Sequence, residues 1–244
     1  GIYGSKPGTI IRHNVFEEIS GAGIHQYNQK EPAGGNCEFY GNIFRKPRKM
    51  TVRGSGREYY LDIIAWGEGG NLIFNNVFYG EGKRGGVSLN SRGNRVYNNT
   101  FVGSTFGVSF GAEKTGNHVV NNIFKDVNTF IVRPRDAIPA VIEHNIYYNT
   151  VVTPKWERGV GAADRDFDTY QKASGELNSH YVDPKLVADD DARLQVGSPA
   201  IDKGATLKQV TVDFKGVARP KDGYDIGAYE FDPAAAKQTP AATK

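Results

Sequence analysis

Residues 71–78 read Asn-Leu-Ile-Phe-Asn-Asn-Val-Phe, and closely related stretches occupy residues 94–101 and 117–124. Both offsets between these copies are 23 residues. Looser copies lie at residues 10–16, 38–44 and 142–147, so the motif occurs six times. Self-similarity at a fixed period indicates a repeat architecture, in which each repeat packs against its neighbours.

Each copy places short runs of β-branched and aromatic residues on both sides of its asparagine. A third run follows, as in residues 86–89 and 107–110. Three short strands per repeat do not suit a helical solenoid, but they suit a coil whose turns lie in register and form parallel sheets. A leucine-rich horseshoe is the rival solenoid, but its L-x-x-L-x-L spacing is missing. The repeat therefore predicts an all-β fold, a parallel β-helix.

The second asparagine of each copy is expected at a sharp bend between two strands, because Asn tolerates the left-handed backbone conformation. Stacked from turn to turn, its amide can donate to one copy and accept from the other, as Asn ladders do. The residue two places further along is expected to form an interior stack. The asparagines are Asn14, Asn42, Asn76, Asn99, Asn122 and Asn145, and the stacked residues are Phe16, Phe44, Phe78, Phe101, Phe124 and Tyr147.

The composition narrows the class of protein. A length of 244 residues with 39% hydrophobic content is enough to build a core, and 30 glycines suit an architecture of strands and tight turns. The formal net charge of +3 is mild, and no apolar run approaches the roughly 20 residues that a membrane span needs. We expect neither a nucleic-acid partner nor a membrane span. The single Cys37 excludes an internal disulfide and is expected to be a small buried residue.

The Asn-Asn-x-Phe turns resemble those of the right-handed parallel β-helix proteins of the pectate-lyase-like superfold. Residues 197–204, 213–216 and 225–231 resemble the C-terminal closing segment of many secreted bacterial β-helix proteins. This resemblance extends nearly to Phe231, and it implies a right-handed coil that is secreted or at the cell surface. Members include polysaccharide lyases, glycosidases, epimerases and proteins without established activity, so the likeness implies fold more than chemistry.

The chain is expected to have three regions. Residues 1–151 form the turns of the coil. Residues 152–231 lose the period and are expected to cap it, because the end of a solenoid exposes strand edges and apolar interior. Residues 232–244 read as a low-complexity tail. Within the cap, the acidic run at residues 189–191 is expected to be solvated surface, with calcium binding as the alternative.

The chain starts at Gly1, within ten residues of the first repeat. We therefore expect that an N-terminal portion is missing and that the uncapped coil end allows self-association.

The spacing of the motif breaks at two places. From Asn14 to Asn42 it is 28 residues, and from Asn42 to Asn76 it is 34. The extra residues fall on consecutive turns, in loops around residues 26–34 and 45–59. If both loops leave the coil on the same side, they would wall a groove, and loops on a rigid scaffold are where function concentrates.

The second loop is strongly basic and has aromatic neighbours. It contains six cationic residues and one acidic residue, Glu58. Arg pairs carboxylate or sulfate through two hydrogen bonds, and aromatic faces cover sugar rings, so the pattern predicts an acidic polysaccharide as partner. The alternative is an ordinary solvated loop. The basic residues are Arg45, Lys46, Arg48, Lys49, Arg53 and Arg57, and the neighbours are His25, Tyr27, Tyr59, Tyr60 and Trp66.

A lyase must neutralise the uronate carboxylate, remove the adjacent C5 proton and assist the leaving oxygen. The sequence offers Arg53, Arg57 or Lys83 for the first role or as the base, and His25, Tyr59 or Tyr60 as the acid. A glycosidase would need two carboxylates across the groove, and the nearest candidates are Asp62, Glu58 and Glu68. The remaining basic and aromatic residues would bind substrate.

Departures from known enzymes keep the function open. Arg133-Pro134-Arg135 matches the Arg-x-Pro-x-x-Arg element of pectate lyases only superficially, so their catalytic residues cannot be transferred. His13, His118 and His144 are expected to be structural. Two hypotheses remain: a polysaccharide lyase or a fragment of one, and a non-catalytic glycan-binding, surface or self-assembling β-helix module.

Overall fold

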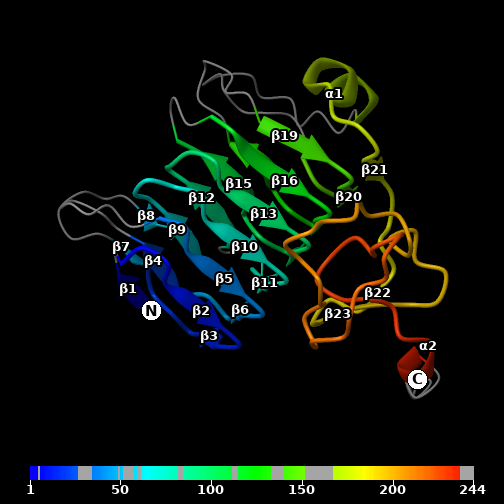
Figure 1. The fold of residues 1–244 in the computed structure, drawn as a ribbon, viewed down its shortest axis with the longest axis horizontal. Helices are drawn as coiled ribbons and strands as arrows, with labels where there is room; N and C mark the ends of the chain where they lie inside the picture. The colour runs from blue at the N-terminus through cyan, green and yellow to red at the C-terminus, as the bar shows by residue number, and fades with distance from the viewer. Residues whose placement is uncertain are drawn as a thin grey trace.

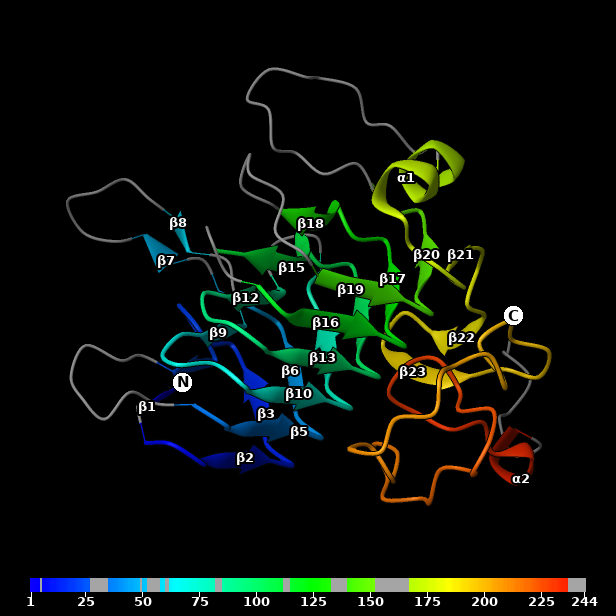
Figure 2. The same cartoon turned by 45° about the horizontal axis from the view of Figure 1, so that its top comes forward.

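The computed structural model describes residues 1–4, 6–26, 35–48, 50–51, 58–59, 62–81, 85–111, 115–132, 140–151 and 167–236. Within these residues the short strands form three parallel sheets that stack turn upon turn (Figures 1 and 2). Each complete turn contributes one strand to each of the three sheets, which we call A, B and C. Along the chain, a turn passes from sheet B to sheet C and then to sheet A. We name the three bends the B–C, C–A and A–B corners. The predicted right-handed parallel β-helix is confirmed.

Sheet A consists of β1 (Ile2–Gly4), β4 (Ile24–Gln26), β9 (Ile63–Ala65), β12 (Val87–Leu89), β15 (Phe106–Phe110) and β18 (Thr129–Val132). Sheet B consists of β2 (Ile10–Arg12), β5 (Glu38–Tyr40), β10 (Leu72–Phe74), β13 (Arg95–Tyr97), β16 (Asn117–Val120) and β19 (Ala140–Glu143). Sheet C consists of β3 (Val15–Glu17), β6 (Ile43–Arg45), β11 (Val77–Tyr79), β14 (Thr100–Val102), β17 (Ile123–Lys125), β20 (Ile146–Tyr148) and β21 (His180–Tyr181). The other elements are the strand pairs β7 (Met50–Thr51) with β8 (Glu58–Tyr59) and β22 (Leu186–Ala188) with β23 (Asp191–Leu194), and the helices α1 (Phe167–Ser174) and α2 (Pro233–Ala236).

The second asparagine of each motif forms the predicted ladder at the B–C corner. Asn76 donates through Nδ2 to Oδ1 of Asn99 at 3.0 Å, and Asn99 donates in the same way to Asn122 at 3.1 Å. The same oxygens also accept backbone hydrogen bonds within the ladder: Asn99 accepts from the N–H of Asn76, and Asn122 accepts from the N–H of Asn99, both at 2.9 Å. The amides are fully buried, and this column pairs donors and acceptors that would otherwise be buried without partners.

The left-handed backbone conformation, however, belongs to the first residue of each pair. Asn75, Asn98 and Asn121 have φ of 50°, 49° and 60°, so the expectation that the second asparagine takes this conformation was wrong. In the other three copies this position holds His13, Gly41 and His144, which also have positive φ. The bend thus uses one residue for its backbone and the next for its side chain.

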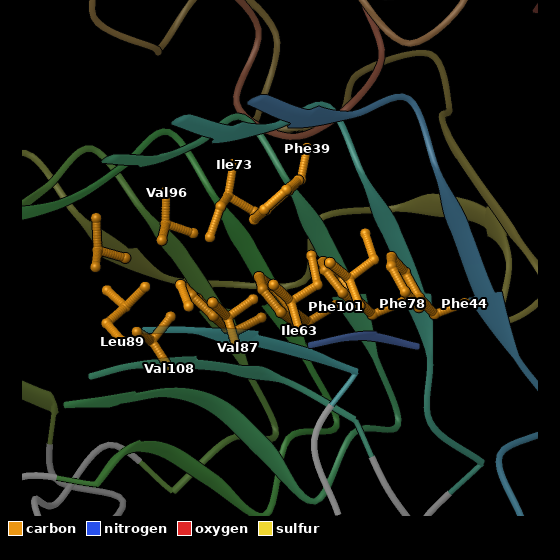
Figure 3. Packing of buried hydrophobic residues seen from close by; sticks show 14 of the residues in the cluster. Phe39, Phe44, Ile63, Ile73, Phe78, Val87, Leu89, Val96, Phe101 and Val108 are labelled. Carbon is orange, nitrogen blue, oxygen red and sulfur yellow. The ribbon is translucent and has the colours of Figure 1, made fainter. Parts of the chain in front are cut away.

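The interior is filled by stacked side chains, as expected from the motif. The ring of Phe101 lies between Phe78 and Phe124, with centroids at 4.4 and 4.9 Å and interplanar angles of 4° and 12°. Figure 3 shows Phe78 and Phe101 of this stack beside side chains of the other two sheets, such as Ile73 and Val87. Cys37 is buried against the same core, as predicted.

The segment after the coil divides between the end of the coil and its flank. In α1, Tyr170 packs into the main core near Tyr147, with ring centroids 6.4 Å apart. By contrast, residues 186–231 run beside the coil along sheets B and C (Figure 1). No helix among the described residues is long and apolar enough to cross a membrane.

The first asparagines of the pairs attach this flanking segment. Asn98 donates through Nδ2 to the carbonyls of Asp225 and Gly227, at 3.0 and 3.2 Å. Asn121 exchanges two hydrogen bonds with the backbone of Ala205, both at 2.8 Å. Each Asn-Asn pair therefore has two functions: one amide joins the turns of the coil, and the other binds the segment that covers it.

Arg219 adds a buried charge to the same contact. Its guanidinium donates to Oδ1 of Asn75 at 3.0 Å and forms an ion pair with Glu230. Burial raises the pKa of Glu230 to about 6 and lowers the pKa of Arg219. A buried pair of this kind is tolerated only when further hydrogen bonds satisfy it, and the carbonyl of Gly227 accepts one at 3.1 Å.

Candidate functional site

The outer face of sheet A is the surface that the flanking segment leaves uncovered. Apolar residues of this segment pack on outward side chains of sheet B, such as Phe74, and of sheet C, such as Ile123. Among the described residues, no apolar cluster joins residues 186–231 to sheet A.

Both insertions border this sheet. Residues 27–34 follow β4 at the A–B corner, and the longer insertion lies between β6 and β9 at the C–A corner. The two insertions thus start from opposite ends of the strands of sheet A rather than from one side of the coil. Most of their residues lie outside the described ranges, so the groove that they would wall stays a prediction.

Three aromatic rings gather on the outer face of sheet A. His25 of β4 lies edge-on to Trp66, which follows β9, with ring centroids 6.0 Å apart. Tyr3 of β1 lies on the other side of His25 at 5.0 Å. Tyr3 is 66% exposed and Trp66 is 37% exposed, so both rings are accessible. We call Tyr3, His25 and Trp66 the aromatic cluster.

The strand register explains how this cluster forms. Tyr3 pairs with His25 and His25 with Ile64, so these positions form one outward column. The next two positions of the column are Ser88 and Ser109. The sequence singled out His25 and Trp66 but missed Tyr3, because β1 carries no asparagine motif and its register is visible only in the paired strands. Partial burial lowers the pKa of His25, which favours the neutral imidazole.

The described part of the basic insertion is closely paired with carboxylates. Lys46 lies 2.7 Å from Glu17, and Arg45 lies 3.3 Å from the same carboxylate. Arg48 pairs with Glu18. The hydrogen bond from Lys46 is the largest factor that lowers the pKa of Glu17. These two glutamates come from the preceding turn, so counting charges within the loop overstated its positive charge.

The other predicted residues divide between described and undescribed parts of the chain. Arg45, Lys46 and Arg48 start the C–A corner, whereas Trp66 follows the opposite end of β9, so the structure does not bring all of them together. Asp62 accepts a hydrogen bond from the backbone of Gly86 at 3.2 Å. Outside the described ranges lie Arg53, Arg57, Lys83, Lys49, Tyr27 and Tyr60, and of Glu58 and Tyr59 only the backbone is described, in β8.

The structure also places described carboxylates that the sequence suggested for glycosidase chemistry or for calcium binding. Asp62 precedes β9 and Glu68 follows it, so these two glycosidase candidates lie at opposite ends of one strand. In the acidic run, Asp189 pairs with Lys125 and Asp191 with Arg193. The described residues contain no group of three or more His, Cys, Asp or Glu side chains that could hold a metal ion.

Comparison with known proteins identifies one family. The family described as "Periplasmic copper-binding protein (NosD)" matches residues 1–155, which is more than half of the chain. No curated protein gives a significant match.

This description implies copper, for which imidazole, thiolate and thioether are the fitting ligands. Among the described residues, no three or more His, Cys, Asp or Glu side chains gather to hold such an ion. The match covers the whole of the predicted coil, and the stacked parallel sheets agree with it. The chain belongs to the NosD family of right-handed parallel β-helix proteins.

Proposed function

We propose that this protein acts outside the cytoplasm and binds an extended acidic polysaccharide along the outer face of sheet A. The family description places NosD proteins in the periplasm, which suits a protein that meets glycans. This fold hosts many activities, so the residues on the surface of the coil determine the function.

The aromatic cluster is the observation that carries this proposal. Tyr and Trp combine a flat apolar body with a polar edge, which suits the two kinds of surface on a sugar ring. The exposed rings of Tyr3 and Trp66 lie on either side of His25, along the direction in which turns stack. A chain of sugars that follows the coil axis would pass over all three rings.

The preference for acidic sugars rests on the basic insertion beside this face. Three described cations form ion pairs with the carboxylates of Glu17 and Glu18. The sequence of the insertion adds three more cations, at residues 49, 53 and 57, and one acidic residue, Glu58. Binding that depends on such partly exposed charges weakens when salt screens them.

A lyase is the enzymatic form of this proposal. Arg53, Arg57 or Lys83 would neutralise the uronate carboxylate, and Tyr59 would protonate the leaving oxygen. A neutral His25 suits proton acceptance better than the donation suggested by the sequence, because its pKa is lowered. The alternative is a module that binds glycan without cleaving it.

A binding experiment with matched variants tests the proposal. Pectate, alginate and glycosaminoglycans are titrated into the full chain, with a neutral glucan for comparison. Trp66→Ala should weaken binding of acidic chains at least tenfold, and Tyr148→Ala, an aromatic change on sheet C, should not. Equal binding of the neutral glucan would reject the preference for acidic sugars, and unchanged binding by Trp66→Ala would reject the site.

The absorbance of unsaturated uronate products separates the two forms. Product that disappears in Arg53→Ala and Arg57→Ala variants supports a lyase. Binding without product supports the module.

A further inference from the structure

The copper-type ligands of this chain are few, and almost all of them lie in described residues. The sequence holds five histidines, one cysteine and one methionine. The histidines and the cysteine are all within the described ranges, and of the methionine only the backbone is described. These residues are His13, His25, Cys37, Met50, His118, His144 and His180.

The geometry of the coil keeps these ligands apart. In a parallel stack, a side chain has as nearest neighbours the residues at the same position of the adjacent turns, about 4.8 Å away. For His118 these residues are Arg95 and Val141. For His25 they are Tyr3 and Ile64. Neither histidine has a second copper ligand at these positions.

Two of the other ligands are engaged or enclosed, whereas His13 lies edge-on to Tyr40 and His180 pairs with Ile146. The ring of His144 contacts the Lys203 carbonyl and the Asn178 amide, each at 3.1 Å. Cys37 is buried beside Gln26, whose Nε2 lies 3.2 Å from Sγ. Burial raises the pKa of the Cys37 thiol, which disfavours the thiolate that binds metals.

We infer that the coil of this chain has no copper centre of its own. Copper binding, which the family description names, is then not a property of the β-helix scaffold. It requires donor side chains at adjacent positions, and this chain places other residues there.

Copper titration of the full chain tests the inference. Metal-free protein is titrated with Cu(I) and with Cu(II), each against a chromophoric chelator, and Cu(II) samples are followed by electron paramagnetic resonance. The expected result is no saturable site of one equivalent and no single defined spectrum. One equivalent of copper that resists the chelator, and is lost in His→Ala or Met50→Ala variants, would overturn the inference.

A gain-of-binding variant tests whether the absence of donor side chains at adjacent positions explains the absence of a copper centre. Arg95→His with Val141→His would place three imidazoles at one position of β13, β16 and β19, around His118. Val141 is 40% exposed and Arg95 is partly exposed, so both changes lie at the surface. The double variant should retain one equivalent of Cu(II) at least tenfold more tightly than the unmodified chain, whereas Arg95→Gln with Val141→Thr should not. If the histidine variant keeps its circular dichroism spectrum but gains no copper, missing donors are not the reason and the inference fails.

Discussion

Replacing Asn99 with alanine should cause one of the largest losses of stability available in this protein. The Asn99 amide donates to the Ile73 and Tyr97 carbonyls at 3.0 Å each and to the next asparagine of the ladder at 3.1 Å. Its Oδ1 accepts two bonds from Asn76, one from the backbone and one from the side chain. All of these groups are buried, so no water replaces the lost partner.

The size of the effect follows from this count. A typical net contribution is about 1 kcal/mol per hydrogen bond, and the two amide protons of Asn99 are shared among its three acceptors, so the loss of two donated and two accepted bonds costs roughly 2–6 kcal/mol. Asn14→Ala is the matched control, because Asn14 is exposed at the end of the ladder and donates through its amide only to Arg12 and Asn42. Its loss should cost about 1 kcal/mol or less.

Urea unfolding monitored by circular dichroism measures both variants. The slope with denaturant should stay unchanged if the folded state is intact, and the midpoint then reports stability. If the free energies of unfolding of the two variants differ by less than about 1 kcal/mol, the ladder does not stabilise the coil as argued.

Three further results are expected. Phe101→Ala should lower the free energy of unfolding by about 3–5 kcal/mol, because it removes a fully buried ring from a continuous stack; a loss below about 1 kcal/mol in urea would contradict this packing. Asn98→Ala should accelerate amide exchange in residues 225–228 while the coil stays protected, since that side chain holds the flanking segment; equal acceleration in both would refute a separate attachment. Glu230 has a pKa of about 6, raised above its ordinary value of 4.5 by burial, so its stabilising effect is complete below about pH 4.5 and is lost as the pH rises through 6. The loss is about 2 kcal/mol, and urea midpoints from pH 4 to 7 should depend less on pH in Glu230→Gln, which an unaltered dependence would disprove.

The asparagine pair shows how far sequence patterns reach. Six copies with Asn at the second position predicted the ladder, and the hydrogen bonds of Asn76, Asn99 and Asn122 confirm it. The wrong residue was given the left-handed conformation, because both members of the pair are asparagine in the clearest copies. The first position of the pair varies between copies, and this variation could have identified it as the left-handed residue. One copy has Gly41 at this position, and glycine adopts positive φ at no steric cost.

The candidate site was only partly predictable. His25 and Trp66 were named from their residue types and proximity to the insertions, and the structure brings their rings together. Tyr3 could not be found, because its contact depends on the pairing of β1 with β4. The charge of the basic insertion was misjudged for the same reason, since Glu17 reaches Arg45 and Lys46 across turns that are distant in sequence.

The sequence by itself determined the parallel coil and its interior, because a repeat of constant length stacks identical side chains and this local periodicity is readable along the chain. Only the tertiary structure decided where residues 186–231 lie and on which sheets of the coil they pack. That choice depends on complementarity between an irregular segment and the surface of the coil, including the contacts of Asn98, Asn121 and Arg219. Such contacts join residues more than eighty positions apart, and no period along the chain records them.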